Sequence, residues 1–214
     1  MDQQANNIFD EIVKDRRSVR TFTEIVPPRE QVEEILNAGL LAPYAELGLE
    51  SEEFRRFAVI PRGSQLIDRA AQIMRDQVTG MYEALQAEMG HNAYLKGMAE
   101  GFARRLKMVA DGGEIGFESA AYFIVIGEKS GFPPVELRSL AHVQQNMWLK
   151  ATALGLGYRL VSLTTQMTDN EEFCALICFP PGVYGLDGCA IGYPKSVPPP
   201  TERPALADIT SWLG

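Results

Sequence analysis

The residues best suited to chemistry lie in one short stretch near the amino terminus, Arg16-Arg17-Ser18-Val19-Arg20. It places three guanidinium groups and a hydroxyl within five residues, on a chain whose formal net charge is −8. A guanidinium fork matches two oxygens of a phosphate at once, and a hydroxyl adds a further donor. The stretch therefore indicates a phosphate-binding site, although a run of arginines is also typical of a solvated surface.

The other residue types that commonly carry chemistry give no comparable pattern. His91 and His142 lie far apart in the sequence, without metal-ligand spacing, so we expect no metal site. Cys174, Cys178 and Cys189 are too few for a disulfide framework, and we expect them to be reduced and mostly buried. The glycine-rich motifs of Rossmann and P-loop nucleotide sites are absent.

Length and composition predict a single globular domain. The chain has 214 residues, enough for one domain over residues 1–214 with a substantial core. Its acidic balance argues against a nucleic acid partner, which would require an extended basic surface. No apolar run reaches the roughly 18 residues that span a bilayer, and the amino terminus lacks the basic and apolar regions of a signal peptide. We therefore expect a cytoplasmic protein with no membrane partner.

Apolar periodicity, prolines and glycines predict the elements that position these residues. Helices are expected at 6–15, 28–41, 135–154 and 168–179, and a helical stretch broken near Gly90 at 64–108. A capping box of Thr168 and Glu171 is expected to start the last helix. Strands are expected at 57–60, 122–126, 158–163 and 189–193, followed by an extended proline-rich tail at 194–204. The chain is thus predicted to be α+β.

Two further motifs follow the arginine stretch in order. A long apolar helix carries Gln145-Asn146 and ends in Ala-Leu-Gly-Leu-Gly at 153–157. The last strand ends in Gly192-Tyr193-Pro194, before a tail with a single arginine, Arg203. This ordered set resembles the FMN-dependent nitroreductase family over nearly the whole chain. The resemblance implies a three-layer α/β/α sandwich, with a central, mostly antiparallel sheet flanked by helices, in an intertwined homodimer.

The resemblance also implies a cofactor-binding role for residues from both ends of the chain. The FMN phosphate and ribityl chain would be held by Arg16, Arg17, Ser18, Arg20 and Arg203. The positions near the reactive edge of the flavin ring match Ser162 and Leu163, and Asn146 in the helix motif is a further candidate contact. No catalytic side chain is implied, because hydride transfer is the chemistry of the flavin.

The chain departs from the family pattern after the second helix. Family members often carry an asparagine there that contacts the flavin ring, whereas this chain reads Ala42-Pro43-Tyr44-Ala45-Glu46. Pro43, Tyr44 and Ala45 are still expected to approach the ring, through backbone groups or stacking. The glutamates of this loop either meet a cationic substrate or are simply solvated.

The segment 64–118 matches the family least and is predicted to be a helical, lid-like elaboration. Its large side chains either stack over the flavin or substrate, or pack these helices against the body. The side chains in question are Met81, Tyr82, Tyr94, Met98 and Phe102.

The activity implied by the resemblance is that of an FMN-dependent NAD(P)H oxidoreductase, which reduces nitroaromatic, quinone or related small-molecule acceptors. Two alternatives stay open. One is another chemistry on the same flavin cradle, such as reductive dehalogenation or breakdown of the flavin itself. The other is a flavin-binding protein with little turnover, which the missing ring asparagine allows.

Overall fold

Four antiparallel strands form one sheet in the part of the protein that the computed structural model describes, residues 2–44 and 54–213. Their order across the sheet is β1 (Arg55–Pro61), β2 (Tyr122–Lys129), β4 (Tyr184–Gly192) and β3 (Gly157–Leu160). β2 and β4 lie in the middle and pair along their whole length, from Tyr122 opposite Ile191 to Lys129 opposite Tyr184. Helices cover both faces of β2, which explains its continuous apolar sequence.

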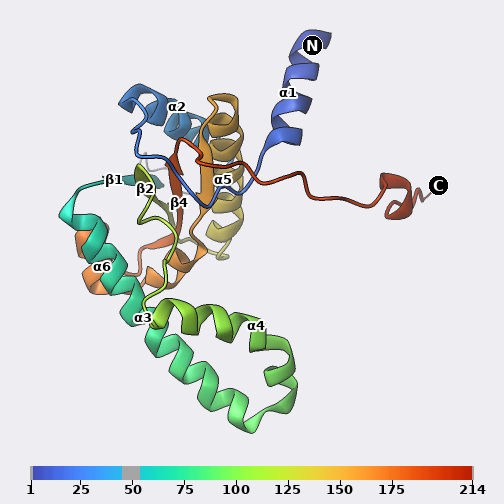
Figure 1. The fold of residues 1–214 in the computed structure, drawn as a ribbon. Coiled ribbons are helices and arrows are strands. Elements are labelled where there is room, and N and C mark those ends of the chain that lie inside the picture. Colours follow the sequence, from blue (N-terminus) through green and yellow to red (C-terminus); the bar gives the residue numbers. More distant parts are fainter. Residues whose placement is uncertain (1, 45–53, 214) are drawn as a thin grey trace.

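One face of the sheet is covered by α2 (Arg29–Leu40) and α5 (Glu136–Ala153), which lie side by side (Figure 1). Alternate residues of the central strands point into this layer, among them Ile124 and Cys189, and both are fully buried. The two helices approach closely at Gly39, where a Cβ would lie 2.8 Å from the Cγ atom of Met147. A side chain at position 39 would therefore force these helices apart.

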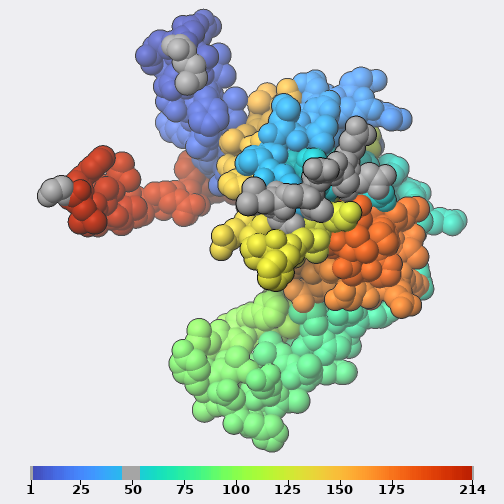
Figure 2. Space-filling model, turned by 180° about the vertical axis from the view of Figure 1, so that it is seen from behind, coloured from blue at the N-terminus to red at the C-terminus, as the bar shows by residue number. Residues whose placement is uncertain are grey.

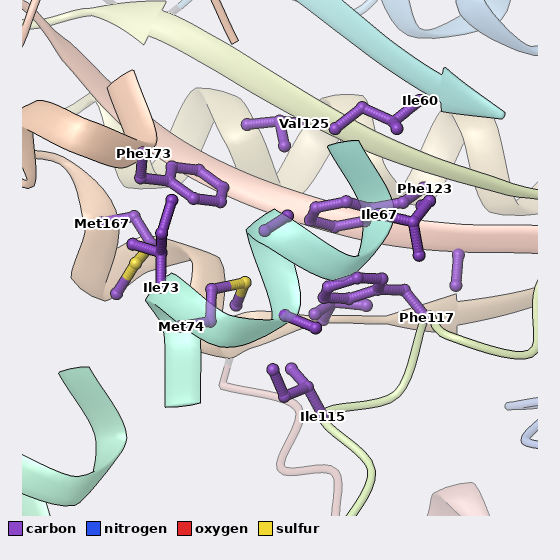
Figure 3. Packing of buried hydrophobic residues seen from close by; sticks show 14 of the residues in the cluster. Ile60, Ile67, Ile73, Met74, Ile115, Phe117, Phe123, Val125, Met167 and Phe173 are labelled. Carbon is purple, nitrogen blue, oxygen red and sulfur yellow. The ribbon is translucent and has the colours of Figure 1, made fainter. Parts of the chain in front are cut away.

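The opposite face is covered by α3 (Gln65–His91), the 3-10 helix η1 (Ser162–Met167) and α6 (Glu171–Leu176). Figure 3 shows Phe123 and Val125 of β2 in this layer, with Ile67 and Met74 of α3 nearby. The ring of Phe123 stacks on that of Phe117, with centroids 4.0 Å apart. The two helical layers and the sheet confirm the predicted α/β/α sandwich with an antiparallel sheet.

The stretch predicted to be helical at 64–108 forms a hairpin of two long helices, α3 and α4 (Ala93–Ala110). The break falls at Asn92, whose side chain accepts a hydrogen bond from the backbone N–H of Leu95 and so caps α4. The hairpin projects away from the sandwich body (Figure 2). The carboxyl end of α4 returns to the body and leads through the segment 111–121 into β2.

Both chain ends extend away from the body: α1 (Gln3–Asp15) at one end, and the tail with the short 3-10 helix η2 (Leu206–Asp208) at the other (Figure 1). The apolar residues Ile8 and Phe9 of α1 are therefore not buried in the single chain. The segment 18–23 leads back to the sheet, where Val19 N–H donates to the carbonyl of Tyr158 at 3.0 Å. Thr21 carbonyl accepts from Lys195 N–H at 2.9 Å, which brings the amino-terminal segment beside the tail.

Three predicted elements need correction. The strand expected at 158–163 ends at Leu160, because Val161 leaves the extended conformation, with a ψ of 66°, and the chain turns into η1. The helix expected at 168–179 is α6 alone, capped by Asn170 rather than by Thr168. The last strand begins at Tyr184, five residues before the predicted start at Cys189, since both of its faces are buried.

The cysteines are reduced, as predicted, but one of them is exposed. Cys174 and Cys189 are buried, whereas Cys178 is exposed. Cys178 lies beyond the end of α6 and adopts a positive φ of 59°, so it does not share a helix face with Cys174.

Within the described ranges, no helix is long and apolar enough to cross a membrane.

Candidate functional site

A pocket of about 520 Å³ lies where the amino-terminal segment meets the proline-rich tail. One wall comes from the end of α1 and the arginine stretch, and the other comes from the tail beyond Pro194. Its lining residues are Val13, Lys14, Arg16, Arg17, Ser18, Arg20, Pro198, Pro199, Pro200, Thr201 and Arg203. All five residues predicted to hold the phosphate are therefore brought together at one pocket.

The charge of this pocket, which we call the cationic cradle, is entirely positive. Its lining holds Lys14 and four arginines with the hydroxyls of Ser18 and Thr201, and no carboxylate. Among the described residues, Arg16, Arg20 and Arg203 form no ion pair that would neutralise them. Converging guanidinium and hydroxyl groups of this kind suit a phosphate monoester with its two negative charges.

Another pocket of similar volume, about 520 Å³, lies beside α3 and α6 and differs in charge. Its lining includes Asp76 and Glu172 and no cation. Of these two pockets, the cradle is the one suited to a phosphate.

The backbone holds the arginine stretch against the sheet edge. Ser18 forms a parallel bridge with Tyr158 of β3. The neighbouring Val19 is buried against Gly157, where a Cβ would lie 2.7 Å from the Cγ1 atom of Val19. The alternation of a strand then turns the flanking side chains of Ser18 and Arg20 to the opposite side, toward the cradle.

Arg17 is fixed by its own neighbourhood. Its Nη1 donates to the carbonyls of Lys14 at 2.6 Å and Arg16 at 2.9 Å, which belong to the end of α1. Its Nε is buried and has no hydrogen-bond partner among the residues that the structure describes. An unsatisfied buried donor at the wall of the cradle is consistent with a site built for an acceptor.

The residues predicted to approach the flavin ring lie outside the cradle lining. Asn146 of α5 donates from Nδ2 to the Ala38 carbonyl of α2 at 3.2 Å. Ser162 opens η1, and Leu163 packs against the core on the α3 side of the sheet.

The segment after α2 is described only in part. Pro43 and Tyr44 lie three and four residues beyond the end of α2 at Leu40, and the Tyr44 hydroxyl donates to the Lys129 carbonyl at 3.0 Å. The Tyr44 ring lies 4.6 Å from that of Phe54, centroid to centroid. Ala45 and the acidic residues after it fall outside the described residues.

Two cations near the cradle were missed by the sequence reasoning. Arg159 of β3 and Arg105 of α4 both donate to the Ile115 carbonyl, and Arg20 lies close enough to influence Arg159 electrostatically. Since these residues are far apart in the sequence, only the fold could reveal their proximity.

A second polar group lies between the sheet and α5. Burial raises the pKa of Asp187 to about 6, against the opposing effect of the hydrogen bonds from Gly188 N–H and the Gln144 side chain. The Tyr158 hydroxyl donates to Gln144, and burial raises the pKa of Tyr158 well above its ordinary value.

Across the described ranges, no set of three or more histidine, cysteine or acidic residues could hold a metal ion.

Comparison with known proteins agrees with this geometry. The family model described as "Nitroreductase family" matches residues 13–193. No curated protein matches the chain in sequence. A nitroreductase with bound FMN from Desulfitobacterium hafniense is 20% identical, with a TM-score of 0.70 over 97% of this chain and 99% of that one. A nitroreductase with bound FMN from Bacteroides fragilis is 19% identical, with a TM-score of 0.69 over 96% and 98%.

A larger protein has the same fold. The NADPH:FMN oxidoreductase from Vibrio harveyi, complexed with NAD+, is 19% identical, with a TM-score of 0.63 over 96% of this chain and 77% of that chain. At these identities the similarity to solved structures shows a common fold.

Proposed function

The chain belongs to the nitroreductase family, whose model covers most of its length, and on that premise we propose that it is an FMN-dependent oxidoreductase. It takes electrons from NADH or NADPH and passes them to a nitroaromatic, a quinone or a related small acceptor. The observation that carries this proposal is the cradle, where cations from both ends of the chain converge without a carboxylate. The FMN bound to solved structures of the same fold supports it.

The residues of the cradle fit the FMN phosphate. Arg16, Arg20 and Arg203 supply guanidinium groups that no acidic residue of the described chain neutralises, and Ser18 adds a hydroxyl donor. Arg17 supplies the buried Nε, for which residues 2–44 and 54–213 provide no acceptor. The same residues would orient the cofactor, since the bridge between Ser18 and Tyr158 fixes the arginine stretch to the sheet.

The residues that would lie near the flavin ring are Ser162 and Leu163. They open η1, shortly after the edge strand β3, on which Arg159 also lies. Asn146 acts indirectly, through its hydrogen bond to the end of α2, from which Pro43 and Tyr44 continue. When bound, FMN supplies the electron transfer between the nicotinamide and the acceptor. The chain's own residues bind and orient it and set the local charge.

We also propose that the protein is a homodimer. Apolar side chains at both chain ends are exposed in the single chain, with Ile8 at 50% and Phe9 at 55% in α1, and Leu206 at 73% and Ile209 at 67% in the tail. A monomer rarely leaves apolar surface of this kind uncovered. A second copy of the chain would cover both ends.

In this proposal, residues 1–214 are one domain, and the α3–α4 hairpin is its lid-like elaboration. Met81 and Tyr82 pack partly against the core, so they anchor the hairpin. Tyr94 and Met98 on α4 are 78% and 71% exposed, and these side chains are free to meet a substrate. The hairpin thus combines the two roles that the sequence left open.

The first test is the visible spectrum and turnover of the purified protein. The proposal expects yellow protein that oxidises NADH or NADPH in the presence of nitrobenzene or a benzoquinone. A protein that retains FMN but oxidises neither donor would contradict the enzymatic proposal and favour the flavin-binding alternative.

A further inference from the structure

Arg105 and Arg159 place a second group of positive charges beside the cradle. Their guanidinium groups donate to the same acceptor, the Ile115 carbonyl, at 3.1 Å from Arg105 and 3.5 Å from Arg159. Arg20, which lines the cradle, acts on Arg159 as a like charge. Two cations from α4 and β3 therefore meet at one carbonyl oxygen, and Arg20 of the cradle lies within electrostatic range of them.

The acidic residues nearby partly offset this positive charge. Glu114 and Glu118 act on Arg159 from the adjoining turn, but in the described chain neither forms an ion pair with it. Instead the Glu118 carboxylate accepts the backbone N–H groups of Ile115 and Gly116, each at 2.8 Å, and of Phe117 at 3.0 Å. Burial alone would raise the pKa of Glu118, but these donors outweigh it and lower the pKa. Glu118 therefore stabilises the turn at residues 115–118 through these hydrogen bonds.

Arg159 is held in a costly position. Burial, followed by repulsion from Arg105, lowers the pKa of Arg159, and Arg20 lowers it further. The guanidinium lies against Gly116, which has a φ of +134°, and a Cβ at this position would collide with it. A partly buried cation with like-charged neighbours is unfavourable unless an anion completes the site.

We propose that Arg105 and Arg159, with Arg20 at their edge, form a second oxyanion site that binds the carboxylate or phosphate group of a substrate. This inference rests on the proposed function, because it assigns the substrate class of that same enzyme. The oxyanion has two possible sources, a carboxylated acceptor and the 2′-phosphate of NADPH. In both cases, the protein selects a substrate by its negative charge.

The surface beside this site suits an aromatic acceptor. Tyr94, Met98 and Phe102 follow one another at four-residue spacing on α4, and Arg105 comes three residues later, so all four share one helix face. The first three are exposed, by 78%, 71% and 48%. An aromatic acid could rest its ring against this face with its carboxylate toward Arg105 and Arg159.

The test replaces Arg159 by glutamine and uses Arg104→Gln, an exposed neighbour of Arg105 on α4, as the matched control. Two ratios of kcat/KM are measured per bound flavin: 4-nitrobenzoate over nitrobenzene, and NADPH over NADH. Because losing a charge-assisted contact typically weakens binding about tenfold or more, Arg159→Gln is expected to lower one ratio by that factor. Arg104→Gln should leave both ratios unchanged. Calorimetric titration with benzoate gives a readout independent of turnover.

The outcomes separate the two sources. A lower first ratio with weakened benzoate binding assigns the site to the acceptor, and a lower second ratio assigns it to the donor phosphate. Two unchanged ratios overturn the inference. So does an equal loss with both acceptors that accompanies a more negative flavin reduction potential, because the arginines would then serve the flavin. Failure of the proposed function looks different, since then neither donor is oxidised by any variant.

Discussion

The guanidinium of Arg16 lies over the indole ring of Trp148, 4.3 Å from the ring centroid. The indole Nε1 donates to the Arg17 carbonyl at 3.0 Å, and the indole also stacks with Tyr158 at a centroid distance of 5.1 Å. One tryptophan on α5 therefore positions two consecutive residues of the cradle and ties them to the sheet.

Replacing Trp148 by phenylalanine is expected to weaken FMN binding. It removes the hydrogen bond to Arg17 and reduces the cation–π attraction on Arg16, together worth about 1–2 kcal/mol, or roughly 5- to 30-fold in dissociation constant. Titration of the FMN-free protein with FMN measures this constant. Trp212→Phe is the matched control, because Trp212 is 92% exposed near the end of the tail. Equal FMN affinity in both variants would remove Trp148 from the support of the cradle.

Arg20→Ala and Arg203→Ala should each lower FMN retention. Arg20 and Arg203 lie on opposite walls of the cradle, and each variant removes one charged donor, a contact worth roughly 1.5–3 kcal/mol. Flavin content after gel filtration and the FMN dissociation constant report the loss, with Arg104→Ala as the control for removing a distant arginine. Full flavin occupancy in both variants would show that the cradle holds something other than the FMN phosphate.

We expect Arg55 to stabilise the folded protein, in the region next to the segment that carries Pro43 and Tyr44. Its side chain and that of its ion-pair partner Glu128 are both fully buried. Its Nη1 donates to the carbonyls of Gly39 at 2.7 Å and of Ala42 at 3.0 Å, at the end of α2. Arg55→Met leaves a buried carboxylate without this partner and should destabilise the protein by about 3–5 kcal/mol.

Urea unfolding measures this cost at neutral pH, with Arg104→Met, at an exposed arginine of α4, as the control. A second variant, Arg55→Met with Glu128→Leu, removes both charges and should recover much of the loss. A single Arg55→Met variant as stable as the wild type would contradict the assignment.

Asp187 predicts a pH dependence of stability. Burial raises its pKa from 3.8 to about 6, so the folded protein binds a proton more tightly than the unfolded chain does. The stabilisation from this proton is complete below about pH 4 and is lost as the pH rises through about 6. Each pKa unit is worth about 1.4 kcal/mol, so the loss amounts to at most about 3 kcal/mol.

Asp187→Asn keeps the shape but not the charge. Relative to the wild type, the variant should therefore gain stability between pH 4 and pH 7, as measured by urea unfolding at each pH. A difference between the two proteins that stays constant across this range would mean that Asp187 titrates normally.

Phe9→Asp tests the proposed dimer. It places a charge on the exposed apolar face of α1, where Phe9 is 55% exposed in the single chain. If this face meets a second copy, light scattering should show the wild type at twice the chain mass and the variant shifted toward one chain. Glu11→Gln on the same helix is the control. A wild type that binds FMN as a monomer would refute the dimer.

The sequence alone carried the family and most of the fold. The motifs around Arg16 and Gly157 consist of neighbouring residues, so they can be recognised directly in the sequence. The buried central strands and the long helices follow from apolar runs and apolar periodicity. Shorter elements were predicted less well. β3 stops at Leu160 because the chain turns into the 3-10 helix η1 at Ser162, and the residues from Val161 to Leu163 do not signal this turn in the sequence.

Only the tertiary structure decided which charges meet. It joins Arg203 to the arginine stretch, through the pairing of Thr21 with Lys195, and it brings Arg105 and Arg159 to one carbonyl oxygen across 54 residues of sequence. It also buries Asp187 beside α5 and leaves the apolar face of α1 exposed. Electrostatic energy depends on distance through space and on burial, and neither quantity can be read from spacing along the chain.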